Sequence, residues 1–212
     1  MHDHSPNTQP GHRPGTPRHI GILLFDGVEE LDAVGPWEVL AHWTQEHPED
    51  GWAVSTFSQD GEPVVGAKGL RFGTTHDSRD SLPALDVLIY PGGPGTRPRL
   101  DDADHLAWVR EQRLSVPLLA SVCTGSLVYA AAGLLTRRPA TTHWASLNLL
   151  SELDPTVITD VAARFVDDGD VVTSAGVSAG IDMGLHLVAR FAGVDRAREV
   201  RRDIQYDPQP PV

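Results

Sequence analysis

The 212-residue chain has a single cysteine, no long apolar run and few basic residues. One cysteine cannot form an internal disulfide, which fits a reducing compartment. No apolar run approaches the ~20 residues of a membrane helix, and the first residues lack the apolar core of a secretory signal. We therefore expect a cytoplasmic protein that makes no membrane contact.

Basic residues are outnumbered by acidic ones, with 17 Lys and Arg against 29 Asp and Glu, for a formal net charge of −12. A surface of this sign repels phosphate backbones, so nucleic acid is not an expected partner. The hydrophobic fraction of 40% is enough for the core of one domain of this size. A small-molecule ligand remains compatible with this composition.

The first 18 residues are rich in proline, glycine, histidine and polar side chains, with almost nothing to bury. We predict a disordered N-terminal tail over 1–18 and one folded domain over 19–212. The tail contains His2, His4 and His12. We expect a solvated segment rather than a metal site, because ordered zinc sites need ligands at fixed tetrahedral positions.

From residue 19, short apolar runs alternate with segments of helical period, which predicts an α/β fold with a mainly parallel sheet. The predicted strands cover 20–25, 52–57, 86–90, 117–122, 157–165 and 170–174. The predicted helices cover 32–46, 103–114, 127–135, 144–153, 179–191 and a short segment from 195. Pro36 falls in the first turn of the first helix, and Asp101 or Asp102 caps the second. The glycine-rich stretch 62–75 predicts a hairpin outside the main sheet, and 167–169 a turn between the last two strands.

Three groups of residues follow predicted strands, at the sheet edge where open α/β folds bind ligands. They are Asp32 after the first strand, Gly92 and Gly93 after the strand 86–90, and Cys123 and Thr124 after the strand 117–122. Because the carboxyl ends of parallel strands meet at one edge, we expect these groups to converge. This convergence is the main argument for a site.

Cys123 lies between a buried strand and a helix, the context of a nucleophile elbow, with Ser121 where such elbows usually have glycine. Free N–H groups at a helix N-terminus can lower a thiol pKa from about 8.5 to below about 7.5. We therefore expect a thiolate at neutral pH. The alternative is an inert thiol that packs as a small hydrophobic side chain.

Asp32 precedes the first predicted helix, where it could simply cap the helix. Beside a thiolate, its pKa would be raised by burial and like charge, so that it could donate a proton at neutral pH. Gly92 and Gly93 allow close approach of a substrate and offer N–H donors, although a Pro-Gly-Gly sequence is also an ordinary turn. The glycines match neither a phosphate-binding nor a dinucleotide-binding motif, so no nucleotide cofactor is implied.

Two histidines remain to be placed. His143, in a Thr-Thr-His-Trp sequence, could serve as general base to Cys123, but it has no evident orienting partner and is expected to line the pocket. Trp144, Trp37 and Val177 are further candidates for the pocket wall. His186, on the last long helix, is expected to be structural.

Five segments in this order resemble the PfpI superfamily, which is class I glutamine amidotransferase-like. They are GILLFDGVEELDAVGPWEVL, LIYPGGPG, SVCTGSLVYAAAGLL, RRPATTHWA and TSAGVSAGIDMGLHLVARF. The resemblance extends from about residue 19 to 211. It implies a flavodoxin-like α/β/α sandwich with a mainly parallel central sheet in a single domain, and commonly a homodimer.

Within that superfamily the chain is similar to the isonitrile hydratases, including its ending IQYDPQPP. The resemblance implies that water is added to an isonitrile to give an N-substituted formamide, without metal or organic cofactor. It implies Cys123 as nucleophile, Asp32 as general acid/base and Thr124 as a supporting hydroxyl. Substrate-binding residues would be Gly92, Gly93, His143 and Trp144.

Two departures separate the chain from other branches. PfpI-type peptidases and several glyoxalase or deglycase relatives have histidine after the cysteine, where this chain has Thr124, and the usual glutamate is Asp32 here. Transcription regulators with a similar domain continue into a DNA-binding module, whereas this chain stops at Val212. An alternative is a non-catalytic ligand sensor, or an oxidation sensor that forms a sulfenic acid on Cys123. Another cysteine hydrolase activity is also open.

Overall fold

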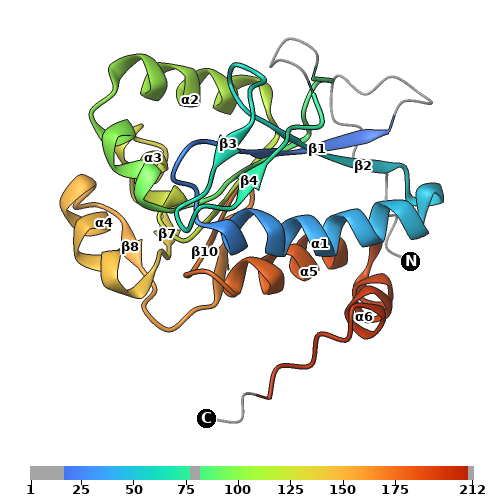
Figure 1. Cartoon of the computed structure of the whole chain (residues 1–212). Helices are drawn as coiled ribbons and strands as arrows, with labels where there is room; N and C mark the ends of the chain where they lie inside the picture. The colour runs from blue at the N-terminus through green and yellow to red at the C-terminus, as the bar shows by residue number, and fades with distance from the viewer. Residues whose placement is uncertain (1–16, 77–81, 210–212) are drawn as a thin grey trace.

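A six-stranded sheet forms the centre of the computed structural model, which describes residues 17–76 and 82–209 (Figure 1). The strand order is β2-β1-β5-β6-β10-β9, and only β9 runs antiparallel to its neighbour. The strands are β1 (Arg18–Leu23), β2 (Trp52–Phe57), β5 (Val87–Tyr90), β6 (Leu118–Val122), β9 (Phe165–Asp167) and β10 (Val171–Ser174). The predicted mainly parallel α/β domain is confirmed. The predicted tail lies almost entirely outside the described residues.

Helices flank both faces of the sheet (Figure 1). One face carries α1 (Glu30–Glu46), α5 (Ala179–Ala192) and α6 (Val194–Asp203), and the other α2 (Ala103–Ser115) and α3 (Gly125–Ala131), while α4 (Leu147–Leu153) lies near α3. Short 3-10 helices cover η1 (Pro48–Asp50), η3 (Pro94–Leu100) and η4 (Trp144–Ser146). None of the helices in the described ranges is long and apolar enough to cross a membrane.

The central strands are apolar along their whole length because helices cover them on both sides. Every residue of β5 and β6 is buried, including the ring of Tyr90, whose hydroxyl bonds His105 of α2 at 2.7 Å. The predicted hairpin also forms, with β3 (Val64–Val65) antiparallel to β4 (Arg71–Phe72). These buried strands fix the sheet edge from which the site is built.

The strand predicted over 157–165 is wrong for most of its length. It contains only β8 (Ile158–Thr159), which pairs with β7 (Pro139–Ala140), and the first residue of β9. The Asp160 side chain accepts hydrogen bonds from the N–H groups of Ala162 and Ala163, both at 3.0 Å, which turns the chain. Such a local side-chain turn competes with strand pairing.

Two helix boundaries also differ from the prediction. α1 begins at Glu30, so Pro36 lies in its second turn, where its ring removes the N–H that would bond the Asp32 carbonyl. α3 is shorter than predicted, because the chain turns at Gly133, whose φ of 78° is left-handed. Asp102 caps α2 as predicted, accepting from the N–H groups of Asp104 and His105.

Candidate active site

Cys123 follows β6 directly and has a φ of 55°, which is strained for a residue with a side chain. Four hydrogen bonds hold its backbone there. Its N–H donates to the carbonyls of Ser174 and Ala175, both at 3.1 Å. Its carbonyl accepts from the hydroxyls of Thr142 at 2.8 Å and Ser126 at 3.1 Å. The strand, the strained residue and the helix that follows form an elbow with a cysteine at its tip.

Asp32 is fully buried in the first turn of α1 and does not cap its own helix. Its Oδ2 atom accepts a hydrogen bond from the Gly92 N–H at 3.0 Å, across the gap between the ends of β1 and β5. Its Oδ1 atom has no hydrogen-bond partner among the residues that the structure describes. A buried carboxyl with one unpaired oxygen is available for a proton or a ligand.

Gly92 and Gly93 join the Asp32 and Cys123 sides of the site. A Cβ atom at Gly92 would lie 2.6 Å from Thr124 Oγ1 and 2.8 Å from Asp32 Oδ2, so a side chain has no room there. Gly93 has a φ of 115°, and its N–H donates to Thr124 Oγ1 at 2.9 Å. Both glycine amides are thus occupied by protein partners, whereas the sequence suggested that they face substrate.

The thiol and the carboxyl share one buried environment, which raises the pKa of both groups. Burial, opposed by the Gly92 hydrogen bond, raises the pKa of Asp32 to about 7. Burial, and then the Asp32 charge, raise the pKa of Cys123 to about 12. The pair therefore holds one negative charge and one proton between these values, and it titrates as a unit.

The prediction that the thiol pKa is lowered is thus wrong in direction. The N–H groups of Thr124 and Val177 do bond the sulfur, and both lower its pKa. Their effect is smaller than that of burial and the neighbouring carboxylate, and α3 has only seven residues to contribute a dipole. Val177 has a φ of 50°, so the second donor also sits on strained backbone.

His143 and Trp144 lie beside this centre rather than in it. The His143 Nδ1 atom accepts from the N–H of Ala145 at 3.3 Å, and its ring occupies the space next to Gly176, the residue before Val177. The Trp144 ring, 5.5 Å from that of His143, is 77% exposed. Among the residues that the structure describes, none gives His143 a carboxylate partner of the kind that orients a general base.

Other candidates from the sequence lie apart from the thiol. Trp37, half-buried on α1, packs against the core. His186 bonds Asp167 at 2.7 Å and stacks on Phe165, which ties α5 to β9 as a structural residue would. Within the described ranges, no three His, Cys, Asp or Glu side chains are grouped as a metal site.

Three hydroxyls that the sequence argument did not single out support the elbow. Thr142 and Ser126 hold the Cys123 carbonyl, and Thr96, fully buried in η3, contacts both Gly93 and Thr124. Ser126 stands three residues after the cysteine, a spacing that could have suggested this bond. Thr142 and Thr96 are distant in sequence, so only the fold reveals their roles.

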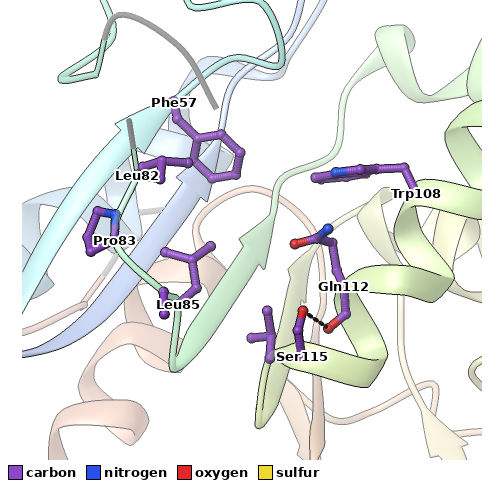
Figure 2. Close-up of a pocket in the computed structure, with 9 residues that line it drawn as sticks. Phe57, Leu82, Pro83, Leu85, Trp108, Gln112 and Ser115 are labelled. Atoms are coloured by element: carbon purple, nitrogen blue, oxygen red, sulfur yellow. Dashed lines mark hydrogen bonds between the residues drawn. The ribbon is translucent and has the colours of Figure 1, made fainter. Parts of the chain in front are cut away.

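A separate hollow of about 260 Å³ lies between β2, the chain that precedes β5, and α2 (Figure 2). Trp108 and Gln112 face Phe57, Leu82 and Leu85 across it in the close-up. The remaining lining residues are Pro83, Ala84, Ser115 and Val116. None of the candidate site residues lines this hollow.

Comparison with known proteins places this geometry among relatives. The model of the DJ-1/PfpI family matches residues 18–190. An isonitrile hydratase from Pseudomonas putida is 41% identical over 192 residues, covering 91% of this chain and 80% of that protein. The HTH-type transcriptional regulator GbdR from Pseudomonas aeruginosa is 30% identical over 207 residues, covering 98% of this chain but only 55% of the regulator.

Solved structures show the same arrangement of the chain. A THiJ/PfpI family protein from Pseudomonas syringae superposes with a TM-score of 0.82 at 31% identity, covering 98% of this chain and 85% of that one. Drosophila melanogaster DJ-1beta superposes with a TM-score of 0.76 at 20% identity, covering 91% of this chain and 100% of that one. The second likeness speaks for the fold alone.

Proposed function

Since this chain belongs to the DJ-1/PfpI family, we propose that it is an isonitrile hydratase with Cys123 as nucleophile and Asp32 as general acid/base. The observation that carries the proposal is the buried thiol–carboxyl pair on a strained elbow, with Asp32 held by the Gly92 N–H. The 41% identity to a protein named isonitrile hydratase supports the substrate class. The product would be an N-substituted formamide.

The first step adds the thiol across the terminal carbon of the isonitrile, R–NC. The Cys123 sulfur forms a C–S bond to that carbon, and the proton held by the Cys123–Asp32 pair moves to the same carbon through Asp32. The product is a thioimidate, R–N=CH–S–Cys123. Because the pair holds one proton and one charge, it can supply both the nucleophile and the acid for this step.

The second step hydrolyses the thioimidate and regenerates the free enzyme. Asp32, now a carboxylate, removes a proton from water as the water oxygen bonds to the thioimidate carbon, and passes this proton to the nitrogen. Asp32 then takes the proton of the new hydroxyl as the C–S bond breaks, and returns it to the sulfur as R–NH–CHO leaves. The sum is one isonitrile plus one water. No oxidant or reductant is consumed, so the scheme uses neither a metal nor an organic cofactor.

The other candidate residues receive supporting roles. Thr124 supplies a hydroxyl at the Gly92–Gly93 turn, and the absence of a side chain at Gly92 lets Asp32 and Thr124 pack directly against that turn. His143 and Trp144 form one side of the substrate entrance, where the exposed Trp144 ring suits an apolar R group. The N–H groups of Thr124 and Val177 stabilise the sulfur whenever it carries negative charge.

The test is turnover by purified protein with cyclohexyl isocyanide and p-nitrophenyl isocyanide, followed as formamide by chromatography. We expect repeated turnover by wild type and none by Cys123→Ala or Asp32→Asn. Asp160→Asn is the matched control, because an asparagine there keeps the turn that Asp160 makes. A wild type that produces no formamide would refute the hydratase for these substrates.

A sensor function is the second candidate. It is favoured by the similarity of nearly the whole chain to a protein named as a transcriptional regulator. The same assay separates the two, since an enzyme consumes many equivalents of isonitrile whereas a sensor binds one ligand or oxidises Cys123 once. Repeated consumption of isonitrile by the wild type would leave the sensor function without support.

We also propose a homodimer. Leu31 and Val34 on α1 are partly exposed, and the hairpin that carries the exposed Val65 and Leu70 is held against the start of α1 through the bond from Lys68 N–H to Glu30. We propose that these four apolar side chains belong to one surface, which a second copy of the chain covers.

A further inference from the structure

Thr96 is a buried hydroxyl whose contacts converge on the candidate site. It is fully buried, and its Oγ1 atom lies 2.8 Å from the Gly93 carbonyl and 3.2 Å from Thr124 Oγ1. Thr124 Oγ1 in turn accepts from the Gly93 N–H at 2.9 Å and lies 3.3 Å from the Gly93 carbonyl. Two hydroxyls thus compete for the same acceptor.

Counting protons shows how the competition is resolved. Each hydroxyl has one proton to donate. The Gly93 carbonyl has two lone pairs, and Thr96 occupies both, with its N–H at 3.1 Å and its hydroxyl at 2.8 Å, whereas Thr124 is 3.3 Å away. The Thr124 proton then has only long contacts, at 3.2 Å to Thr96 and 3.3 Å to Gly93. It is therefore free to be donated to a better acceptor.

The better acceptor lies on the site side of Thr124. A Cβ atom at Gly92 would contact both Thr124 Oγ1 and Asp32 Oδ2, so both oxygens border the same space over Gly92. A substrate atom or water that is bound between Asp32 and Cys123 can reach the Thr124 hydroxyl. The direction of one proton on Thr124 consequently matters to the reaction.

We propose that Thr96 is a positioning residue, which occupies the Gly93 carbonyl and so directs the Thr124 hydroxyl proton into the active site. This inference rests on the proposed hydratase for its kinetic consequence. Removal of the Thr96 hydroxyl would let the Gly93 carbonyl take the Thr124 proton. The site would then lose a donor although Thr124 itself is unchanged.

The kinetic test compares wild type, Thr96→Val, Thr96→Ser, Thr124→Val and the double valine variant. We expect Thr96→Val to lower kcat about tenfold, the loss of one hydrogen bond of ordinary strength, with KM little changed. Thr96→Ser should restore most of the rate. In the Thr124→Val background, Thr96→Val should cause no further loss, because its effect passes through Thr124.

A merely structural Thr96 would give a different pattern. Losses that multiply in the double variant, or a serine variant as slow as the valine variant, would overturn the proposal. An unchanged kcat in Thr96→Val would do so too. If the valine variant fails to fold, Thr96→Ala with Thr96→Ser provides the same comparison.

A readout without isonitrile keeps this test separate from the proposed function. Alkylation of Cys123 by iodoacetamide needs only the thiol, and the Thr124 proton stabilises the negative charge that the pair shares. We expect Thr96→Val and Thr124→Val to slow alkylation by the same factor, and the double variant to be no slower. Multiplied effects would reject the Thr96 role even if the wild type hydrates no isonitrile.

Discussion

At the scale of single residues, the candidate site contains a buried ionisable group and two residues with strained backbone. Asp32 is a fully buried carboxyl, and Cys123 and Val177 have left-handed backbone that costs about 1–3 kcal/mol each. Four hydrogen bonds on the Cys123 backbone hold this conformation. Such strain persists only where the surrounding structure enforces it, and it supports the proposed role of the elbow.

Because Asp32 is buried, its replacement by a neutral residue should stabilise the fold at a pH where its carboxyl is charged. Its folded pKa of about 7 lies above the ordinary value of 3.8, so its favourable contribution is complete below about pH 4 and is lost as pH rises through 7. Asp32→Asn should therefore stabilise the fold at pH 8 by about 1–4 kcal/mol, with little gain at pH 4. Urea unfolding at both pH values measures this.

Asp50→Asn is the opposite control. The pKa of Asp50 is lowered by its hydrogen bonds to Arg196 and Trp43, which oppose the effect of burial. Its contribution is present above the unfolded pKa, so its replacement should destabilise the protein at pH 8. If Asp32→Asn proves less stable than wild type at pH 8, then burial of the charged Asp32 carboxylate does not destabilise the fold.

The shared charge of the pair also predicts a pH profile. Below the pKa of Asp32, about 7, both groups are protonated and no base remains to release the thiol. We expect kcat/KM for isonitrile hydration to rise tenfold per pH unit below about 7 and then to level off. A kcat/KM that is constant between pH 5 and 9 would contradict the sharing of one proton by Cys123 and Asp32.

At the scale of elements, the sequence predicted the buried strands, which apolar runs specify, but it missed the turns and boundaries that individual side chains set. The strand over 52–57 has the predicted bounds, and the apolar strand predicted over 117–122 begins one residue later, at Leu118. The strand over 157–165 failed because Asp160 turns the chain, and α1 began earlier than Pro36 suggested. Thr96 and Thr142 act through partners distant in sequence, which no local pattern contains.

The close packing of α3 on β5 predicts a severe effect of a small change. A Cβ atom at Gly125 would collide with the backbone carbonyls of Tyr90 and Pro91. Gly125→Ala should destabilise the fold by at least about 1–3 kcal/mol and disturb the elbow. Thermal unfolding measures this, with Gly73→Ala as control, since a Cβ at Gly73 meets no atom within 4 Å. Equal stability of the two variants would refute the packing argument.

At the scale of the whole molecule, topology brings the site together. β5 pairs with both β1 and β6, so the carboxyl ends of these three strands deliver Asp32, the two glycines and Cys123 to one edge. The sequence anticipated this convergence because it depends only on parallel strands. It did not anticipate the direction of the thiol pKa, because burial depends on the whole fold.

The proposed dimer is tested at the same scale. Leu70, on the hairpin beside α1, is 52% exposed, and Leu114, on α2, is 89% exposed. Light scattering should give twice the chain mass for wild type and for Leu114→Glu, but the mass of one chain for Leu70→Glu, whose charge would be buried in the interface. If Leu70→Glu remains a dimer, that surface is not the interface.

The most direct measurement of the central claim is intact-protein mass spectrometry after rapid mixing with p-nitrophenyl isocyanide. We expect an adduct of the full isonitrile mass, located on Cys123, which appears before formamide in the wild type. The adduct should form far more slowly in Asp32→Asn, because Asp32 moves the proton in the first step. Cys123→Ala should carry none. Formamide released by wild type with no covalent adduct at any time would contradict nucleophilic catalysis by Cys123.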